Sequence, residues 1–581
     1  MTILTFLFPI ALAVLAYVVY PSTYDSNRAA SCLVLPTDTL WPSIADWENL
    51  NATVGGRLIA TTPLATVCHD PHFDAAKCDI IKKKWLHPFT HEDSANSIMA
   101  PFYQNQSCDP FTPRPKTCEL GNYVSYSINA SSAEDISAGV KFAKRKNIRL
   151  VVKNTGHDFL GRSTGTGGLA IWTHNLRTNQ VIPIYRSPSY NGPAVMLGAG
   201  MRGFEALDIA HKSGLQIFTG FCPTVGVAGG FIQGGGSGPL SSIHGMAADQ
   251  ALEYEVVTAA GETVVASPTR HADLYWALSG GGGGTYAVVT SVTVRAFRDG
   301  VIGGASLSFS RENVGIDTVY DMFGHLLDLT PSLIDAGIQF GWLVTRQAFV
   351  LGPLTAPGLT EEHIRLALKP FAAKLDEEGV NYQLSTTSLP SYKSHFEHYL
   401  GPFPAGRYLA DSMSDGSDSG NTQDHGKQFG FSVYIAANNT MIGTKQPISD
   451  NSVLPQWRKA AVYAMATLEW DFCLPRDDML ARQAELQKFV VPQLRRALPP
   501  DAGTNLNEAE VGNENWKKDY FGGNYERLRL IKRVYDPTDL FYVEYGVGSD
   551  ACLLSALAPT QGDLNPGDDL TDFVIFDLSF K

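Results

Sequence analysis

The chain is poor in positive charge and lacks the loop that binds nucleoside triphosphates. Its 581 residues contain 45 Lys and Arg against 58 Asp and Glu, so the net charge is -13, and no basic run is longer than residues 82–84. Nucleic acid is bound by clustered positive charge, so we expect no nucleic-acid partner. Neither a Walker sequence nor an internal repeat of solenoid length occurs. The length allows two or three domains, each with its own core.

Cysteine is scarce, but its positions are informative. Two close pairs, Cys68 with Cys78 and Cys108 with Cys118, lie in a Pro-rich stretch without zinc-ligand spacing. Such pairs are typical of disulfides that close short loops in an oxidising compartment. The pairing of the other cysteines stays open; they are Cys32, Cys222, Cys473 and Cys552.

Export is also indicated by the N-terminus. An uncharged apolar run occupies residues 3–20, and a polar segment follows as far as Ser31. The run lacks a basic start and a sharp cleavage site, and it reaches the lower length limit for a bilayer span. We expect residues 1–31 to be a signal peptide, or alternatively a retained signal anchor with the body in the lumen. Four sequons could carry N-glycans, at Asn51, Asn105, Asn129 and Asn438.

An α/β pattern follows a Cys/Pro-rich extension. Ser131 and Ser132 with the acidic residues after them predict a capped helix that runs to Lys146. The apolar residues 148–153 predict a buried strand. Further elements are predicted as strands at 195–197 and 286–297, a helix at 204–212, and a hairpin of 254–260 and 263–266 that turns at Gly261.

The pattern of apolar and polar residues changes after Gly300. Longer amphipathic segments, at 361–377 and 461–472, mix with strands such as 429–436, which indicates a second domain. The polar residues 411–426 predict a mobile surface loop.

Glycine is concentrated in four places. Residues 198–203 match G-x-G-x-x-G, but no acidic residue follows at the distance of a ribose ligand, so we interpret them as a tight strand-to-helix turn. The other clusters lie at 154–163, 220–238 and 280–284. Backbone N–H groups in such loops form nests that bind pyrophosphate, so three clusters indicate a long anionic ligand. The alternative is that they are only crowded turns.

Four runs resemble one known family. Residues 149–163 (RLVVKNTGHDFLGRS), 222–226 (CPTVG), 273–281 (DLYWALSGG) and 535–541 (YDPTDLF) look like the berberine bridge enzyme-like group of the vanillyl-alcohol oxidase superfamily. These sequence runs are most similar to those of its secreted fungal members, which include isoamyl alcohol oxidase-like enzymes.

The resemblance implies a two-domain α+β fold and one covalently held FAD. It implies an extension at 32–121, an FAD domain at 122–298 with a returning segment at 521–581, and a substrate domain with an antiparallel sheet at 299–520. His157 would bond the flavin 8α-methyl and Cys222 the flavin C6. Imidazole and thiolate are the nucleophiles that such bonds need.

The same resemblance gives the other flavin contacts. Asp158 either orients His157 or bonds a loop amide, and Tyr542 and Tyr545 would wall the isoalloxazine unless they only pack. The remaining expected cofactor contacts are Asn154, Thr155, Gly156, Gly161, Arg162, Ser163, Gly226, Gly229, Gly230, Gly234, Gly235 and Gly281. We expect no metal ligand.

The substrate side departs from the family. Where relatives carry Tyr-x-Asn-Tyr, this chain has Asn505-Leu-Asn507-Glu508, so Asn507 is retained and both tyrosines differ. Glu508 is either the catalytic base, with a pKa raised by burial, or a solvated loop carboxylate. Weaker candidates for lining the pocket are Trp342, His395, His398 and Tyr434.

These features predict a monomeric oxidase that dehydrogenates a small alcohol, amine or secondary-metabolite intermediate, with or without ring closure, and passes the electrons to oxygen to give H2O2. Two alternatives stay open. One is a carbohydrate oxidase, and the other is a flavin protein that acts as a non-redox cyclase or binding protein.

Overall fold

A computed structural model describes residues 33–310, 312, 314–344, 348–406, 427–439 and 449–551. The expected signal segment 1–31, the expected loop 411–426, Cys32 and Cys552 lie outside these residues. Within them, no helix is both long and apolar enough to cross a membrane.

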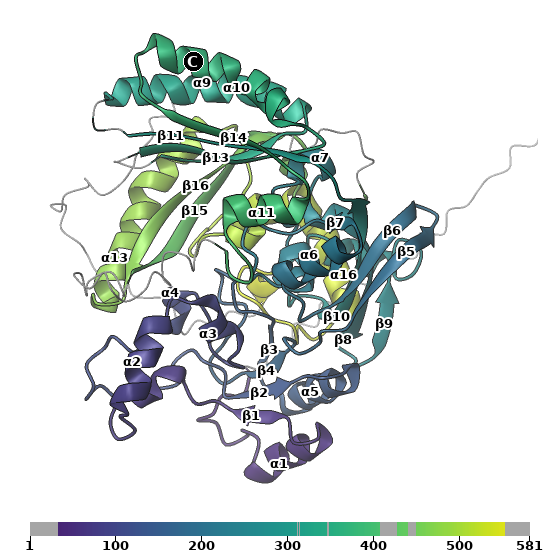
Figure 1. The fold of residues 1–581 in the computed structure, drawn as a ribbon. Coiled ribbons are helices and arrows are strands. Elements are labelled where there is room, and N and C mark those ends of the chain that lie inside the picture. The colour runs from purple at the N-terminus through teal and green to yellow at the C-terminus, as the bar shows by residue number, and fades with distance from the viewer. Residues whose placement is uncertain are drawn as a thin grey trace, which may run out of the picture.

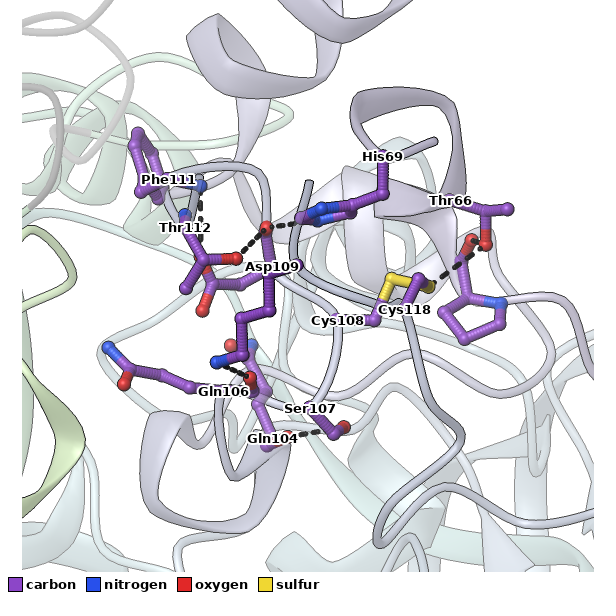
Figure 2. The surroundings of a disulfide bond; sticks show 12 residues. Thr66, His69, Gln104, Gln106, Ser107, Cys108, Asp109, Phe111, Thr112 and Cys118 are labelled. Atoms are coloured by element: carbon purple, nitrogen blue, oxygen red, sulfur yellow. Dashed lines mark hydrogen bonds between the residues drawn. A yellow bond between two sulfur atoms is a disulfide. The ribbon is translucent and has the colours of Figure 1, made fainter. Parts of the chain in front are cut away.

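The N-terminal extension, purple in Figure 1, is a set of short elements at one end of the molecule. They are α1 (Ile44–Thr53), β1 (Leu58–Ala60), the 3-10 turn η1 (Leu64–Cys68), α2 (Ala75–Lys84), α3 (Pro88–Glu92) and α4 (Pro101–Gln104). The predicted disulfides Cys68–Cys78 and Cys108–Cys118 are both confirmed. As Figure 2 shows, His69 links the two disulfide loops through its Nε2, which lies 2.9 Å from the Asp109 carbonyl oxygen.

A four-stranded sheet follows, in the order β1-β2-β4-β3. Its parallel strands are β2 (Tyr126–Asn129), β3 (Leu150–Lys153) and β4 (Leu169–Trp172), and β1 of the extension adds antiparallel to β2. The predicted capped helix is α5 (Ala133–Lys146), whose N-cap Ser132 accepts a hydrogen bond from the Asp135 amide. Its apolar face packs into the core beside this sheet.

The second sheet has the order β5-β6-β10-β8-β9, and β7 pairs with the far end of β10. Its strands are β5 (Asn179–Ser187), β6 (Tyr190–Gly198), β7 (Leu215–Ile217), β8 (Ala251–Thr258), β9 (Thr263–Ala266) and β10 (Ala287–Arg298). Its helical segments are α6 (Gly203–Lys212), η2 (Val227–Phe231), α7 (Ser241–His244), η3 (Ala247–Gln250) and α8 (Ala272–Leu278). The predicted hairpin, helix and strands of this region are confirmed. Residues 198–203 form the expected turn from β6 to α6.

The third sheet is antiparallel in the order β12-β13-β11-β14. Its strands are β11 (Ile302–Ser310), β12 (Gln339–Val344), β13 (Ala348–Pro357) and β14 (Gln383–Leu389). The helices α9 (Ile316–Asp335) and α10 (Glu361–Glu377) cover one face, whereas α11 (Tyr392–Leu400) lies on the other, next to α6 (Figure 1). The predicted helix 361–377 is confirmed.

A long two-stranded ribbon forms a separate sheet, and its second strand contacts α9. It consists of β15 (Lys427–Asn439) and β16 (Ala460–Asp471). The segment 461–472, grouped by sequence with the amphipathic helix 361–377, is therefore a strand. Its alanines permit a helix, but pairing with β15 along twelve positions decides the outcome. The 3-10 turn η5 (Pro455–Arg458) lies between the two strands. The elements after β16 are α13 (Arg476–Glu485), η6 (Leu486–Val490), α14 (Val491–Ala497) and η7 (Leu506–Glu508).

The C-terminal elements return to the second sheet. They are α15 (Trp516–Phe521), η8 (Gly522–Asn524), α16 (Tyr525–Tyr535) and η9 (Ser549–Ala551). α16 packs on α8, where the Arg527 guanidinium lies 3.8 Å from the Trp276 ring centroid. One core unites the first two sheets with these elements, and separate cores lie between the third sheet and α9 and α10. The architecture is thus the expected two-domain α+β fold.

Candidate functional site

The loop 154–163, directly after β3, is enclosed by the extension. Lys153 at its base is fully buried, and its Nζ donates hydrogen bonds to the carbonyl oxygens of Ser94 (2.7 Å) and His91 (3.2 Å). Burial lowers the pKa of Lys153 to about 7. Gly161 has a φ of +64°, and a Cβ there would overlap the ring of Tyr103 in α4. The extension therefore shapes this loop from residues 91–103.

The second glycine cluster packs against the first. A Cβ at Gly226 or Gly229 would overlap the side chain of Asn154, whose Nδ2 donates to the carbonyl oxygen of Ala199 at 2.5 Å. Its buried Oδ1 has no hydrogen-bond partner among the described residues. Glycine is thus required for the close approach of the two loops, and a polar acceptor is left unused beside them.

The third cluster is tied to the second by Gln233. Its carbonyl oxygen accepts hydrogen bonds from the amides of Gly280 (3.1 Å) and Gly282 (2.8 Å). A Cβ at Gly283 would lie 3.2 Å from Cα of Gly230, whereas a Cβ at Gly230 would meet nothing within 4 Å. The three clusters therefore meet, although they lie up to 130 positions apart in the sequence. Gly230 lies on an open face of this group.

The two expected flavin anchors lie on either side of one hydroxyl. Nε2 of His157 is 2.8 Å from Oγ1 of Thr224, and Sγ of Cys222 is 3.4 Å from the same oxygen. Both anchors are half-buried, so each side chain is reachable from outside the core. Burial raises the pKa of the Cys222 thiol, against the effect of its hydrogen bonds. The fold thus brings together two side chains that are 65 residues apart.

A buried carboxylate completes the surroundings of His157. Oε1 of Glu92 lies 3.1 Å from Nε2 of His157, and Oε2 lies 3.2 Å from Nη1 of Arg202. The Glu92 side chain is fully buried. Burial acts to raise its pKa, but the bonds to His157 and Arg202 outweigh burial and hold the pKa below its usual value. Glu92 is therefore an ionised group with two partners.

Asp158 takes the second of its two expected roles. Its Oδ2 accepts from the Arg162 amide at 2.5 Å, and its Oδ1 accepts from the Ser163 hydroxyl. The carboxylate beside His157 is that of Glu92, so the structure gives no support to the alternative expectation that Asp158 orients His157. Burial lowers the pKa of the Arg162 guanidinium, whose Nε has no hydrogen-bond partner among the described residues. A cation with spare hydrogen-bonding capacity therefore lies against Gly282 of the third cluster.

The remaining expected cofactor contacts divide between site and core. Tyr545 has a φ of +54°, and its hydroxyl oxygen accepts from the Gly512 amide at 2.6 Å. The Tyr542 ring centroid lies 5.7 Å from the Arg149 guanidinium carbon. Thr155 is buried, and Gly235 packs beside Val453. Two further glycines fit tight places: Gly156 lies against Lys153 and Ile98, and Gly281 against Ala277 and Leu528.

The expected catalytic pair is held close to the second cluster. Nδ2 of Asn507 donates to the Phe231 carbonyl oxygen at 2.9 Å, and a Cβ at Gly234 would overlap the Asn507 amide. Oε2 of Glu508 accepts from Nδ2 of Asn505 at 2.6 Å. Burial raises the pKa of Glu508, although hydrogen bonds from Tyr463 and Asn505 oppose the shift. Glu508 is therefore a partly enclosed carboxyl with a phenol beside it.

Sequence reasoning missed four polar residues of this region. Thr224 lies within the quoted run 222–226, so its position offered a signal. Tyr463 comes from β16, and Glu510 is a buried carboxyl whose pKa burial raises to about 7. No motif gave a signal for Glu92, Tyr463 or Glu510. The fold brings Glu92 to the loop 154–163 and Tyr463 to Glu508.

Two weaker pocket candidates lie elsewhere. His395 is buried, and its Nε2 lies 2.9 Å from Oγ1 of Thr355 on β13. Trp342 packs edge-on to Phe323 between the third sheet and α9, with ring centroids 4.7 Å apart. Both belong to packing contacts of the third sheet. The exposed His398 packs on Tyr399, and the side chain of Tyr434 lies outside the described set.

Family models match two parts of the chain. The model for an FAD binding domain covers residues 124–267, and the one described as berberine and berberine like covers residues 500–548. The first range includes the glycine clusters 154–163 and 220–238 but not the cluster 280–284. The second range includes Asn507 and Glu508. Residues 33–123, which include Glu92 and Tyr103, lie outside both ranges.

Relatives span almost the whole chain. The VAO-type flavoprotein oxidase VAO615 of Thermothelomyces thermophilus is 40% identical over 547 residues, which is 91% of this chain and 95% of the relative. The bifunctional decalin synthase calF of Penicillium decumbens is 39% identical over 555 residues, 90% of this chain and 94% of the relative.

Solved structures agree with this likeness. The crystal structure of the VAO-type flavoprotein MtVAO615 from Myceliophthora thermophila C1 gives a TM-score of 0.83 at 38% identity and covers 89% of this chain and 97% of that one. The glucooligosaccharide oxidase of Acremonium strictum, described with a 6-S-cysteinyl, 8α-N1-histidyl FAD, gives a TM-score of 0.56 at 19% identity over 73% and 92% of the chains. The second likeness is one of fold alone.

Proposed function

The chain belongs to the berberine bridge enzyme-like group of VAO-type FAD-linked oxidoreductases, and from this membership we propose that it holds one FAD through both His157 and Cys222 and oxidises a small organic substrate with dioxygen. The observation that carries the proposal is the shared hydroxyl of Thr224, 2.8 Å from the imidazole and 3.4 Å from the sulfur. One flavin ring spans the distance between its 8α-methyl and C6 positions, so two neighbouring anchors suit a single ring.

The residues around the anchors fit FAD. Three glycine loops meet at one face, and backbone amides in such loops bind pyrophosphate oxygens. The Arg162 guanidinium and the Asn154 amide each have a buried atom, Nε and Oδ1, that bonds no other described residue. A ligand with both anionic and donor groups would satisfy them. When bound, FAD supplies the hydride acceptor and passes the electrons to dioxygen.

We assign the proton transfer to Glu508. Its pKa is raised by burial, which brings a carboxylate closer to the basicity needed near neutral pH. Asn505 holds one of its oxygens, and Asn507 fixes the same 3-10 turn to the second glycine cluster. Glu508 would remove the proton from the O–H or N–H of the substrate, while the adjacent C–H bond faces the cofactor.

Family and site together support a proposal for the substrate class. An alcohol, an amine or a secondary-metabolite intermediate is proposed, with ring closure as one outcome because one relative is a decalin synthase. The carbohydrate alternative gains no support, since Asn505 and Glu508 replace the tyrosines of the expected sugar-oxidase motif. The two disulfides of the extension suit an oxidising compartment, so we propose the secretory pathway.

Anaerobic reduction tests the reaction. The purified holoenzyme is mixed with a panel of alcohols, amines and polyketide alcohols without oxygen, and the visible absorbance of the flavin is followed. Bleaching by a substrate, then one H2O2 per turnover after oxygen is admitted, supports the oxidase. Product formation without bleaching would contradict it and would favour the non-redox cyclase.

A further inference from the structure

The carboxylate of Glu92 is a buried charge that the proposed reaction does not use. It ends α3 in the extension, and its side chain has no solvent exposure. A buried carboxylate is costly unless charged or polar partners compensate it. Its two partners are His157 and Arg202, so it lies between a flavin anchor and a cation.

The rest of the network keeps Glu92 in place. Arg202 also bonds Glu205 through Nη2 (3.1 Å) and Nε (3.2 Å), so its charge is balanced twice. The extension is fixed to the flavin loop nearby, because the Met99 amide donates to the Gly156 carbonyl oxygen at 3.2 Å. Lys153 adds a second link through the Ser94 carbonyl oxygen. Glu92 therefore has little freedom to move away from His157.

The contacts of His157 decide which nitrogen is free. Glu92 Oε1 and Thr224 Oγ1 both face Nε2, and among the described residues no hydrogen bond engages Nδ1. A carboxylate beside one imidazole nitrogen holds the proton there and leaves the lone pair on the other. The Thr224 hydroxyl, accepting from Nε2, can donate its own proton to the sulfur of Cys222.

We propose that Glu92 is a positioning residue for flavin attachment, which holds His157 by its Nε2 so that Nδ1 is free to bond the flavin methyl carbon. This rests on the proposed attachment at His157. The Nδ1 lone pair would form the new bond as the methyl carbon gives a proton to solvent and its C–H electron pair to the flavin ring. Dioxygen would then take these two electrons and two solvent protons to give H2O2, while the Nε2 proton stays shared with the ionised Glu92 carboxylate.

The assignment gives the extension a chemical role. Glu92 lies outside the ranges that match the FAD binding and berberine-like family models. Its lowered pKa, set by bonds to His157 and Arg202 against burial, keeps it ionised and able to stabilise positive charge on the imidazole. If Glu92 only formed a structural ion pair, its bond to Arg202 would be enough, and its bond to His157 would have no role.

The test compares Glu92→Gln with Asp93→Asn. Glutamine keeps the shape and removes the charge, and Arg202 retains Glu205, so the variant is expected to fold. Asp93 is the adjacent carboxylate, with 65% of its side chain exposed, and serves as the matched control. Each holoenzyme is denatured and digested, and mass spectrometry measures flavin on the His157 and Cys222 peptides. Thermal unfolding checks the fold.

In Glu92→Gln we expect flavin on the Cys222 peptide and at least tenfold less on the His157 peptide, with Asp93→Asn like the wild type. Glu92→Asp, which retains the carboxylate, should recover part of the His157 bond and covers the case in which the glutamine variant fails to fold. Full attachment at His157 in a folded Glu92→Gln protein, or none in Glu92→Asp, overturns the role of Glu92. A wild type without flavin on either peptide instead overturns the proposed attachment.

Discussion

At the scale of single residues, the site depends on polar groups whose ordinary properties are changed by burial. Glu508, Glu510 and Lys153 each have a pKa displaced by desolvation toward the neutral form. Glu92 differs, since its partners keep it charged. Displaced pKa values are typical of catalytic and cofactor sites. Each of these residues therefore makes a separate experimental target.

Removing the carboxylate of Glu508 should slow the reaction without loss of flavin. Glu508→Gln is expected to lower kcat by about 100-fold to 10,000-fold, the range for loss of a general base. In the wild type, kcat/KM should rise with pH through the raised pKa of Glu508, because the base acts when unprotonated. The variant should lose that rise. Glu514→Gln, an exposed carboxylate nearby, is the control; unchanged kinetics in Glu508→Gln would exclude it as the base.

The buried Lys153 should make stability depend on pH. Its pKa falls from 10.5 to about 7 on folding, so the unfolded chain binds more protons between these values. The free energy of unfolding therefore rises with pH in this window, by at most about 1.4 kcal/mol per pH unit. Urea unfolding at pH 7 and pH 8.5 should show a smaller rise in Lys153→Met than in the wild type or in the exposed control Lys459→Met. Equal slopes would contradict the assignment.

At the scale of elements, the sequence predicts most regular structure around the site. The cap at Ser132 and the turn at Gly261 are local signals, and α5 and the β8–β9 hairpin follow them. The strand β16 was missed because its alanines carry no local preference for a strand and its partner β15 is distant in sequence. Local signals such as caps and turns can therefore be predicted from the sequence, whereas the pairing of distant strands cannot.

The same limit applies to the site. The glycine clusters and the resemblance point to His157 and Cys222, because those residues lie in recognisable runs. Glu92 and Tyr463 come from segments with no such pattern, and Asp158 sits beside His157 in sequence but bonds its own loop. Adjacency in the chain therefore left the role of Asp158 open, and the carboxylate that bonds His157 comes from 65 residues upstream.

A substitution at Gly230, on the open face of the glycine clusters, should change cofactor binding without changing folding. A Cβ at Gly230 meets no protein atom, so Gly230→Ala should fold normally but intrude on the cofactor. In a His157→Ala/Cys222→Ala background, where FAD binds without covalent bonds, we expect its Kd to rise at least about tenfold, or 1.4 kcal/mol. Gly300→Ala, also without neighbours, should change neither Kd nor Tm. An unchanged Kd in Gly230→Ala would move the cofactor away from this face.

At the scale of the whole molecule, the extension connects the loop after β3 with the β15–β16 ribbon. Its α3 and α4 contact the loop 154–163, and Trp85 and Cys108 share a core with Trp470 and Phe472 at the end of β16. Gln106 adds a hydrogen bond from its Nε2 to the Leu474 carbonyl oxygen at 3.0 Å. The extension therefore packs against both the loop 154–163 and the end of β16.

Removing one disulfide should weaken this support. Each bridge closes a loop of ten residues, so a Cys108→Ala/Cys118→Ala variant is expected to lose about 2–3 kcal/mol of unfolding free energy. Cys68→Ala/Cys78→Ala, with the same separation, should lose a similar amount. Cys473→Ala, an exposed free cysteine, should change it by less than about 0.5 kcal/mol. Denaturant titration measures all three, and equal stability throughout would show that the bridges do not support the fold.

The central claim is one flavin held by two bonds, and acid precipitation tests it most directly. The wild type, His157→Ala, Cys222→Ala and the double variant are precipitated with acid, and the flavin absorbance of pellet and supernatant is compared. We predict yellow pellets for the wild type and both single variants, and flavin only in the supernatant for the double variant. Release of the flavin from the wild type would contradict the claim.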